Sequence, residues 1–167
     1  KKLGILVNQI FLITGNKKTV KFLDDLKKLG FEMSTKSGSS ISISDILIPG
    51  KKDEIINNAF KEVGIIQNKF DKHILTDGER YNKVIDVWTH ATNRVAASMM
   101  EDLAKDRDGF NPVFMMADSG ARGSQDQIKQ LAGMRGLMAK PKKSMTGEKG
   151  EIIESPITSN FKEGLSV

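Results

Sequence analysis

The stretch TDGERYNKVIDVWTHATNRVAASMMEDL, residues 76–103, carries the clearest helical pattern in the chain. Thr76 and Glu79 stand three residues apart at its start, which is the spacing of a capping box, where each side chain bonds the backbone amide of the other residue. Apolar residues then recur at steps of three and four, at Tyr81, Val84, Trp88, Ala91, Val95, Met99 and Leu103. This period matches the seam of a coiled coil and predicts one long helix with a continuous apolar face.

A second helix is predicted just before this one, over residues 52–70. Its apolar positions share one face and are Ile55, Ile56, Ala59, Phe60, Val63 and Ile66. The connection between the two helices, residues 71–75, is short, and short connections join helices that pack antiparallel. We therefore expect residues 52–103 to form a projecting helical hairpin with polar outer faces.

The residues on either side of the hairpin are predicted to form a smaller base. Residues 3–22 read as helical with a break near Gly15, and the helical pattern that follows stops at Gly30, a plausible helix end. Residues 41–48 read as a short extended element. Later elements are helices near 111–118 and 124–132, an exposed loop at 141–148, a short strand at 151–154, and a turn with a brief helix at 156–164. The predicted fold class is mainly α, with a long antiparallel hairpin on a smaller helical base and one short extended or β element.

Residues 111–141, NPVFMMADSGARGSQDQIKQLAGMRGLMAKP, are poor in bulky aliphatic side chains. Methionines and glycines are interspersed along them, with two arginines in between: Met115, Met116, Gly120, Arg122, Gly123, Gly133, Met134, Arg135, Gly136 and Met138. Glycine allows close backbone approach, methionine fills irregular gaps, and arginine offers a fork of donors that suits phosphate. The combination suggests a closely packed wall beside a phosphate-bearing ligand. A loop and two helices with methionines placed by chance have the same composition, and the sequence leaves that alternative open.

The net charge of +5 is concentrated in one segment. Between Gly120 and Gly150 there are seven basic and two acidic residues, so the remainder of the chain is neutral. A concentrated basic segment attracts phosphates and polyanions. One hypothesis is therefore a binding module, a free-standing helical adaptor that holds nucleic acid through this segment. The alternative is a solvated loop with spare lysines.

The motifs do not support an independent enzyme. Cysteine is absent, which excludes a disulfide framework and a thiolate metal site. His73 and His90 lack a third ligand at a metal-like spacing. Neither a GxxxxGK[ST] phosphate loop nor a GxSxG elbow occurs in the sequence. No apolar run approaches the roughly 20 residues that a membrane helix needs. The chain starts at Lys1 without an initiator methionine, and we interpret it as a piece of a longer polypeptide.

Three stretches carry a family resemblance. GERYNKVIDVW (78–88), the methionine-rich stretch at 111–141 and PITSNFKEGLSV (156–167) resemble the beta-prime family, the largest catalytic subunit of bacterial DNA-directed RNA polymerase. SISISDILIP (40–49) is similar as well. The likeness extends over nearly the whole chain, and the second stretch is long enough to be highly specific. The first fourteen residues match least clearly, so we carry no site onto them.

The resemblance implies a position at the secondary channel, through which nucleoside triphosphates reach the active centre. The region forms the funnel around that channel, and residues 52–103 correspond to the rim helices at its mouth. In the family these helices dock coiled-coil transcript-cleavage and initiation factors. The alarmone site that forms with such a factor in some bacteria uses the positions carried here by Tyr81, Asn82 and Lys83.

The methionine-rich stretch is implied to line the inner end of the channel. Met116 and Arg122 match family positions close to the incoming nucleotide, and Gln127 and Lys129 match positions near the same pore. Arg122 would hold or steer phosphate. The surplus of basic charge would attract the triphosphate toward a narrow passage.

The remaining implications concern the whole enzyme. Its partners are the alpha, beta, omega and sigma subunits, DNA, RNA and nucleoside triphosphates, in the cytoplasm at the nucleoid and without a membrane. The magnesium-binding signature of the family, Asn-Ala-Asp-Phe-Asp-Gly-Asp, does not occur in the sequence. We therefore expect no catalytic residue, metal or cofactor in this piece, while the parent enzyme uses magnesium. The implied domains are the end of a pore domain (1–15), the funnel domain (16–123), and the start of a cleft or bridge-helix domain (124–167).

Overall fold

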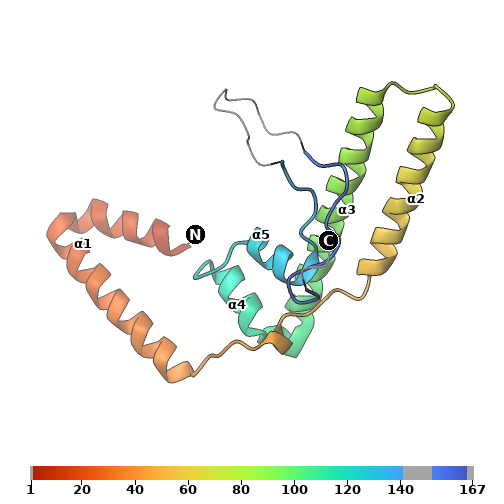
Figure 1. Cartoon of the computed structure of the whole chain (residues 1–167). Helices are drawn as coiled ribbons and strands as arrows, with labels where there is room; N and C mark the ends of the chain where they lie inside the picture. The colour runs from red at the N-terminus through yellow and green to blue at the C-terminus, as the bar shows by residue number, and fades with distance from the viewer. Residues whose placement is uncertain (1, 141–151, 165–167) are drawn as a thin grey trace. The chain divides into compact units, whose positions relative to one another are not determined.

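Helices make up most of the part of the chain that this computed structural model describes, residues 2–140 and 152–164 (Figure 1). The chain divides into two units, Lys1–Ser40 and Ile41–Val167. Two isolated antiparallel β-bridges are present in the described residues, and no named strand. The prediction of a mainly α fold is confirmed. Across the same residues, no helix combines the length and the apolar character that crossing a bilayer requires.

The first unit contains one long helix, α1 (Lys2–Ser37). The predicted break is confirmed at Gly15, whose φ of 75° and ψ of 177° are not helical. The predicted stop at Gly30 is wrong, because the helix continues through this residue to Ser37, and the next residue, Gly38, takes a left-handed φ of 61°. A glycine ends a helix by adopting that conformation, whereas a glycine that stays helical costs only about 1 kcal/mol relative to alanine.

The second unit is built on two long helices, α2 (Lys52–Asp71) and α3 (Asp77–Lys105), which lie side by side and run in opposite directions (Figure 1). The capping box predicted at the start of α3 is confirmed. Thr76 Oγ1 accepts from the Glu79 amide at 3.3 Å, while Glu79 Oε2 accepts from the Thr76 amide at 2.8 Å. The cap fixes the residue at which the helix begins.

The apolar faces of α2 and α3 form the main core with one residue from the later chain. Its buried members are Ile55, Ala59, Val84, Trp88, Ala91, Val95 and Met134. Trp88 is only 2% exposed, and the Phe60 ring meets it edge-on with 4.9 Å between centroids. Phe60 itself is 53% exposed, so it covers the edge of the core instead of filling it.

Residues 41–48 are extended on both sides of a single 3-10 turn, η1 (Ile43–Asp45). Asp45 Oδ2 accepts from the Ser42 amide at 2.8 Å and closes the turn. Ile46 and Leu47 pack against a second core cluster, whereas Ile43 is 74% exposed. Neither β-bridge of the described residues involves this segment. Ile46 and Leu47 thus anchor a connection between the two units' helices, and the isoleucines do not form one face of a strand.

Short helical elements form the base of the hairpin. After the turn η2 (Asp106–Gly109) come α4 (Pro112–Ser119), α5 (Gln125–Ile128) and a π-helical turn, η3 (Lys129–Gly133). The helix predicted at 124–132 is therefore an α-helical turn that widens into a π turn. The second core cluster lies beneath these elements and consists of Met99, Leu103, Val113, Ile128 and Ala132.

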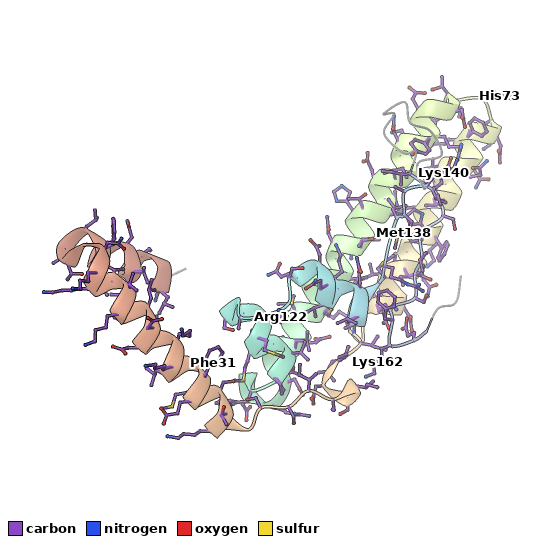
Figure 2. The ribbon with its side chains drawn as sticks, turned by 60° about the vertical axis from the view of Figure 1, so that its left-hand side comes forward. Phe31, His73, Arg122, Met138, Lys140 and Lys162 are labelled. Carbon is purple, nitrogen blue, oxygen red and sulfur yellow. The ribbon has the colours of Figure 1, made fainter. Side chains whose placement is uncertain are left out.

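Beyond η3 the chain forms a short antiparallel ribbon, residues 134–140 paired with residues 152–160. Gly136 and Ile157 exchange two backbone hydrogen bonds of 2.9 Å, and Ala139 pairs with Ile152 in a second bridge. Of the strand predicted at 151–154, residues 152–154 are described, and Ile152 is the bridged residue among them. The loop predicted at 141–148 lies outside the described residues. Figure 2 shows Met138 and Lys140, on the first arm of this ribbon, alongside the hairpin.

Candidate functional site

Arg122 lies on the turn that joins α4 to α5 (Figure 2). α4 ends at Gly120, which has a left-handed φ of 75°, and Gly123 has a φ of 86°. A Cβ added at Gly120 would meet nothing within 4 Å, so this glycine serves the turn and not close packing. The turn leaves Arg122 exposed, and its guanidinium has no hydrogen bond or ion pair within the described residues. Its charge is therefore available to a ligand.

The turn is held in place from the start of α4 by Asn111, which is fully buried. Asn111 Oδ1 accepts from the amides of Val113 at 2.9 Å and Phe114 at 3.2 Å, which is an N-cap. Its Nδ2 donates to the Asp45 carbonyl at 2.9 Å and to Asp106 Oδ2 at 2.8 Å. One side chain thereby joins α4, η1 and the start of η2, directly after α3.

An open cavity of about 430 Å³ lies beside Arg122. Its wall is mostly apolar and is formed by Ile41, Ile46, Val113, Met116, Arg122, Gly123, Gln127, Ile128, Gln130, Leu131 and Phe161. The volume falls within the range of about 300–1,000 Å³ typical of small-molecule sites. A cation at the edge of an apolar hollow suits a ligand with an anionic group and a ring-shaped or apolar body.

Three of the four residues predicted for the channel, Met116, Arg122 and Gln127, share this cavity, and Lys129 does not. Gln127 Oε1 accepts from the Ser124 amide at 3.0 Å, so part of its side chain is engaged in a capping box. Lys129 pairs with Asp126 at 2.8 Å beside a different hollow, between α3 and α5. That hydrogen bond lowers the pKa of the Asp126 carboxyl.

The methionines and glycines that the sequence predicts to form one packed wall lie in two environments, the cavity and the main core. Met116 lines the cavity, whereas Met134 is fully buried in the main core. A Cβ added at Gly133 would lie 3.4 Å from Val95 Cγ1, and one added at Gly136 would lie 3.1 Å from Thr92 Oγ1. These two glycines allow the backbone to approach α3 closely.

Arg135 has a structural environment and does not accompany Arg122 at the cavity edge. Its guanidinium donates to the Ser159 carbonyl at 3.1 Å and to the Gly164 carbonyl at 3.2 Å. The same group lies over the Phe161 ring, 5.2 Å from the centroid, which is a cation–π contact. Of the two arginines singled out in the sequence, only Arg122 presents its charge to solvent.

The start of α3 forms a second candidate site. Arg80 donates to Glu154 through two bonds, Nη1 to Oε2 at 2.6 Å and Nη2 to Oε1 at 2.9 Å. It also donates to Asp77 Oδ1 and lies over the Phe70 ring at 5.3 Å. The bonds from Glu154, followed by those from Asp77, raise the pKa of the Arg80 guanidinium. In return, the hydrogen bond from Arg80 lowers the pKa of the Glu154 carboxyl.

The three residues predicted for the rim, Tyr81, Asn82 and Lys83, come directly after Arg80 in α3. The Tyr81 hydroxyl donates to the Ile152 carbonyl at 3.0 Å, so one end of this side chain is occupied by the ribbon. Asn82 and Lys83 are exposed, and neither side chain has a hydrogen bond or ion pair in the part of the chain that the structure describes. The structure thus presents an amide and an ammonium group together, next to a fixed aromatic ring.

Sequence reasoning missed the contacts that join residues 160–163 to η3 and to α2. Asn160 is fully buried, and its Nδ2 donates to the carbonyls of Ala132 at 3.0 Å and Gly133 at 3.2 Å, at the end of the π turn. Lys52, 5% exposed in its side chain, pairs with Glu163 at 2.5 Å. These partners are far apart in the chain, so no local spacing indicates them.

Four basic residues of the basic segment lie in the described part of the chain: Arg122, Lys129, Arg135 and Lys140. Among its residues, Lys129 and Arg135 are bonded within the protein, and Lys142, Lys143 and Lys149 lie outside the described residues. The described residues contain no group of three or more histidine or carboxylate side chains that could hold a metal ion. Among the described basic residues of this segment, Arg122 is the one whose side chain has no hydrogen bond or ion pair.

Comparison with known proteins gives two family matches. The family described as RNA polymerase Rpb1, domain 4, matches residues 75–162, and RNA polymerase Rpb1, domain 3, matches residues 1–46. The first match contains all seven residues predicted for the channel and the rim.

Individual relatives match over the full length of the chain. They include "DNA-directed RNA polymerase subunit beta'" of Nitratiruptor sp., 55% identical, of Campylobacter fetus, 54% identical, and of Amoebophilus asiaticus, 48% identical. In each case 100% of this chain aligns, and it covers 11%, 11% and 12% of the relative, respectively. The chain thus spans about a ninth of the length of these relatives.

Proposed function

Because the chain belongs to the RNA polymerase Rpb1 family, we propose that it is a segment of a bacterial beta-prime subunit and works within DNA-directed RNA polymerase, a nucleotidyltransferase. Its role there is to build the funnel of the secondary channel and to present a hairpin at the channel mouth. The observation that carries the proposal is that the whole chain aligns with one part of beta-prime subunits, together with the exposure of Arg122, Asn82 and Lys83.

Arg122 is the residue that guides nucleoside triphosphates. Its guanidinium is exposed at the edge of a cavity, and Met116 and Gln127 lie on the same wall. An arginine without internal partners can form charge-assisted hydrogen bonds to passing phosphate oxygens. The apolar part of the cavity offers contact area to the base or sugar. Lys129, which is paired with Asp126, adds long-range attraction and no direct contact.

The test for the channel is Arg122→Ala in the complete polymerase. We expect the apparent KM for nucleoside triphosphate in elongation to rise by about threefold to tenfold, because one charge-assisted contact is lost, while assembly is unchanged. Arg94→Ala is the matched control, since Arg94 is also exposed but lies on α3 away from this cavity. An unchanged KM in the Arg122 variant would refute the guiding role.

The hairpin α2–α3 is the docking platform for coiled-coil transcription factors at the channel mouth. Tyr81, Asn82 and Lys83 form the contact surface, with Lys83 supplying positive charge and Asn82 both donor and acceptor groups. The same three positions would hold an alarmone where the partner factor is present. The adjoining capping box keeps the helix start in register.

Lys83→Glu tests the platform. Reversing the charge should weaken the response of the polymerase to a coiled-coil transcript-cleavage factor, while RNA synthesis without the factor continues. Lys61→Glu on α2 is the matched control, because Lys61 is exposed and lies outside the proposed surface. Loss of synthesis without the factor would instead assign Lys83 a structural role.

The rest of the proposal concerns the parent enzyme. It places the chain in the cytoplasm with alpha, beta, omega and sigma subunits, DNA, RNA and nucleoside triphosphates, and assigns catalysis and magnesium to parts outside these residues. The domains are the end of a pore domain (1–15), the funnel (16–123) and the start of the next domain (124–167). A free-standing nucleic-acid adaptor is not favoured, since the whole chain aligns within a far longer polymerase subunit.

A further inference from the structure

We propose that Glu154 is a positioning residue that holds the first turns of α3 in the orientation needed for factor docking. The inference rests on the proposed function of Tyr81, Asn82 and Lys83. The inference adds Glu154, which lies 74 positions after Arg80 in the chain, on the second arm of the ribbon. Glu154 acts through Arg80 and does not itself belong to the docking surface.

The contact between Glu154 and Arg80 is a paired fork. Both carboxylate oxygens accept from the guanidinium, at 2.6 and 2.9 Å, and the Arg80 side chain is 16% exposed. Two parallel bonds fix the relative orientation of both groups, which a single bond does not do. Because Arg80 also donates to Asp77 and lies over Phe70, the fork connects the ribbon with both helices of the hairpin.

The first turn of α3 depends on this connection because the core lies further along the helix. The buried residues of α3 begin at Val84, and the residues from Asp77 to Lys83 are exposed or half-buried. Helix ends with little buried surface open readily. The capping box stabilises the turn itself, but it contains only Thr76 and Glu79 and cannot orient the turn relative to α2.

The ribbon supplies that orientation through two adjacent residues. Arg80 is bonded to Glu154, and Tyr81 donates its hydroxyl to the Ile152 carbonyl. Ile152 is in turn paired with Ala139 on the first arm of the ribbon. Arg80 and Tyr81 are hydrogen-bonded to the ribbon, whereas the next two residues, Asn82 and Lys83, are exposed to solvent. Glu154 therefore determines how the docking surface is presented.

The experiment uses the complete polymerase carrying Glu154→Gln and a purified coiled-coil transcript-cleavage factor. The readout is cleavage of nascent RNA in stalled complexes as a function of factor concentration. We expect the concentration for half-maximal cleavage to rise by roughly threefold to tenfold, with maximal cleavage and factor-free synthesis unchanged, because a charge-assisted fork becomes a neutral contact. Glu101→Gln is the matched control, since Glu101 pairs with Lys105 at 2.6 Å on the exposed surface of the same helix.

A second variant separates positioning from general loss of stability. Arg80→Gln combined with Glu154→Gln should be no worse than Arg80→Gln alone, because the fork is already broken. Additive losses, or a Glu154→Gln effect equal to that of Glu101→Gln, overturn the positioning role. If Lys83→Glu raises the half-maximal concentration and Glu154→Gln does not, this inference fails and the proposed platform stands. If neither substitution does, the platform itself fails, and the inference with it.

Discussion

Residues 111–123 and residues 129–140 share an unusual composition of methionine, glycine and arginine, but they occupy different environments. In the first segment Arg122 is exposed at a cavity, and Gly120 has open space where a side chain would be. In the second, Met134 is fully buried and Gly136 lies against Thr92 of α3. The difference at these positions is contact with α3, which Gly136 makes and Gly120 does not. A composition rich in glycine and methionine allows the backbone to approach another element closely. Whether it does so depends on whether a helix such as α3 lies beside it.

A buried asparagine organises each of these two segments. Asn111 caps α4, using amides two and three residues ahead of it, and it also reaches η1. Asn160 instead bonds two carbonyls of the π turn that lie 28 and 27 residues before it. The first is mainly a local contact and the second is entirely long-range. The two segments therefore respond differently to substitution.

The largest effect is expected for Asn160→Ala. The variant leaves two buried carbonyls without their donor and removes the acceptor for the Glu163 amide. Each loss costs on the order of 1 kcal/mol or more, so we expect the free energy of unfolding to fall by about 3 kcal/mol. Urea unfolding can be followed through Trp88, the single tryptophan of the chain, which is 2% exposed in the core. Asn82→Ala, an exposed asparagine on α3, is the control and should change little.

An intermediate effect is expected for Gly136→Ala. The new Cβ would lie 3.1 Å from Thr92 Oγ1, at a φ of 78° that alanine rarely adopts. Backbone strain and the close contact together should cost about 2 kcal/mol. Gly120→Ala separates these causes, because its φ of 75° is similar and its surroundings are empty, so only the strain of about 1 kcal/mol applies. Equal losses at the two glycines would show that packing on α3 contributes nothing.

Much of the hairpin could be predicted from the sequence because its determinants are local. Thr76 and Glu79 stand three residues apart, and the apolar period of α3 repeats over its whole length. Gly30 misled the prediction because a glycine ends a helix only in the left-handed conformation, which Gly38 adopts. The π turn at the end of α5 could not be predicted from local sequence either, because Asn160, which donates to it, lies 28 residues later in the chain.

For the candidate sites, the sequence indicates which residues to consider and does not indicate their surroundings. The family resemblance indicates Arg122 and Lys83, but nothing local distinguishes the exposed Arg122 from Arg135, which is bonded within the protein. That distinction depends on residues 159–164, which return to Arg135 after the ribbon. Lys129 shows the same limitation, since its pairing with Asp126 directs it to another hollow.

The smallest effect on stability is expected for Arg122→Ala, and this result sharpens the contrast with Arg135. Arg122 is exposed and has no bonded partner within the described residues, so the free energy of unfolding should change by less than about 0.5 kcal/mol. Arg135→Ala removes bonds to Ser159 and Gly164 and should cost about 1 kcal/mol or more. Both values come from the same urea unfolding of the chain, followed by Trp88 fluorescence. A loss for Arg122→Ala as large as that for Arg135→Ala would mean that both arginines are structural, and a raised KM for nucleoside triphosphate could then no longer be attributed to a lost phosphate contact.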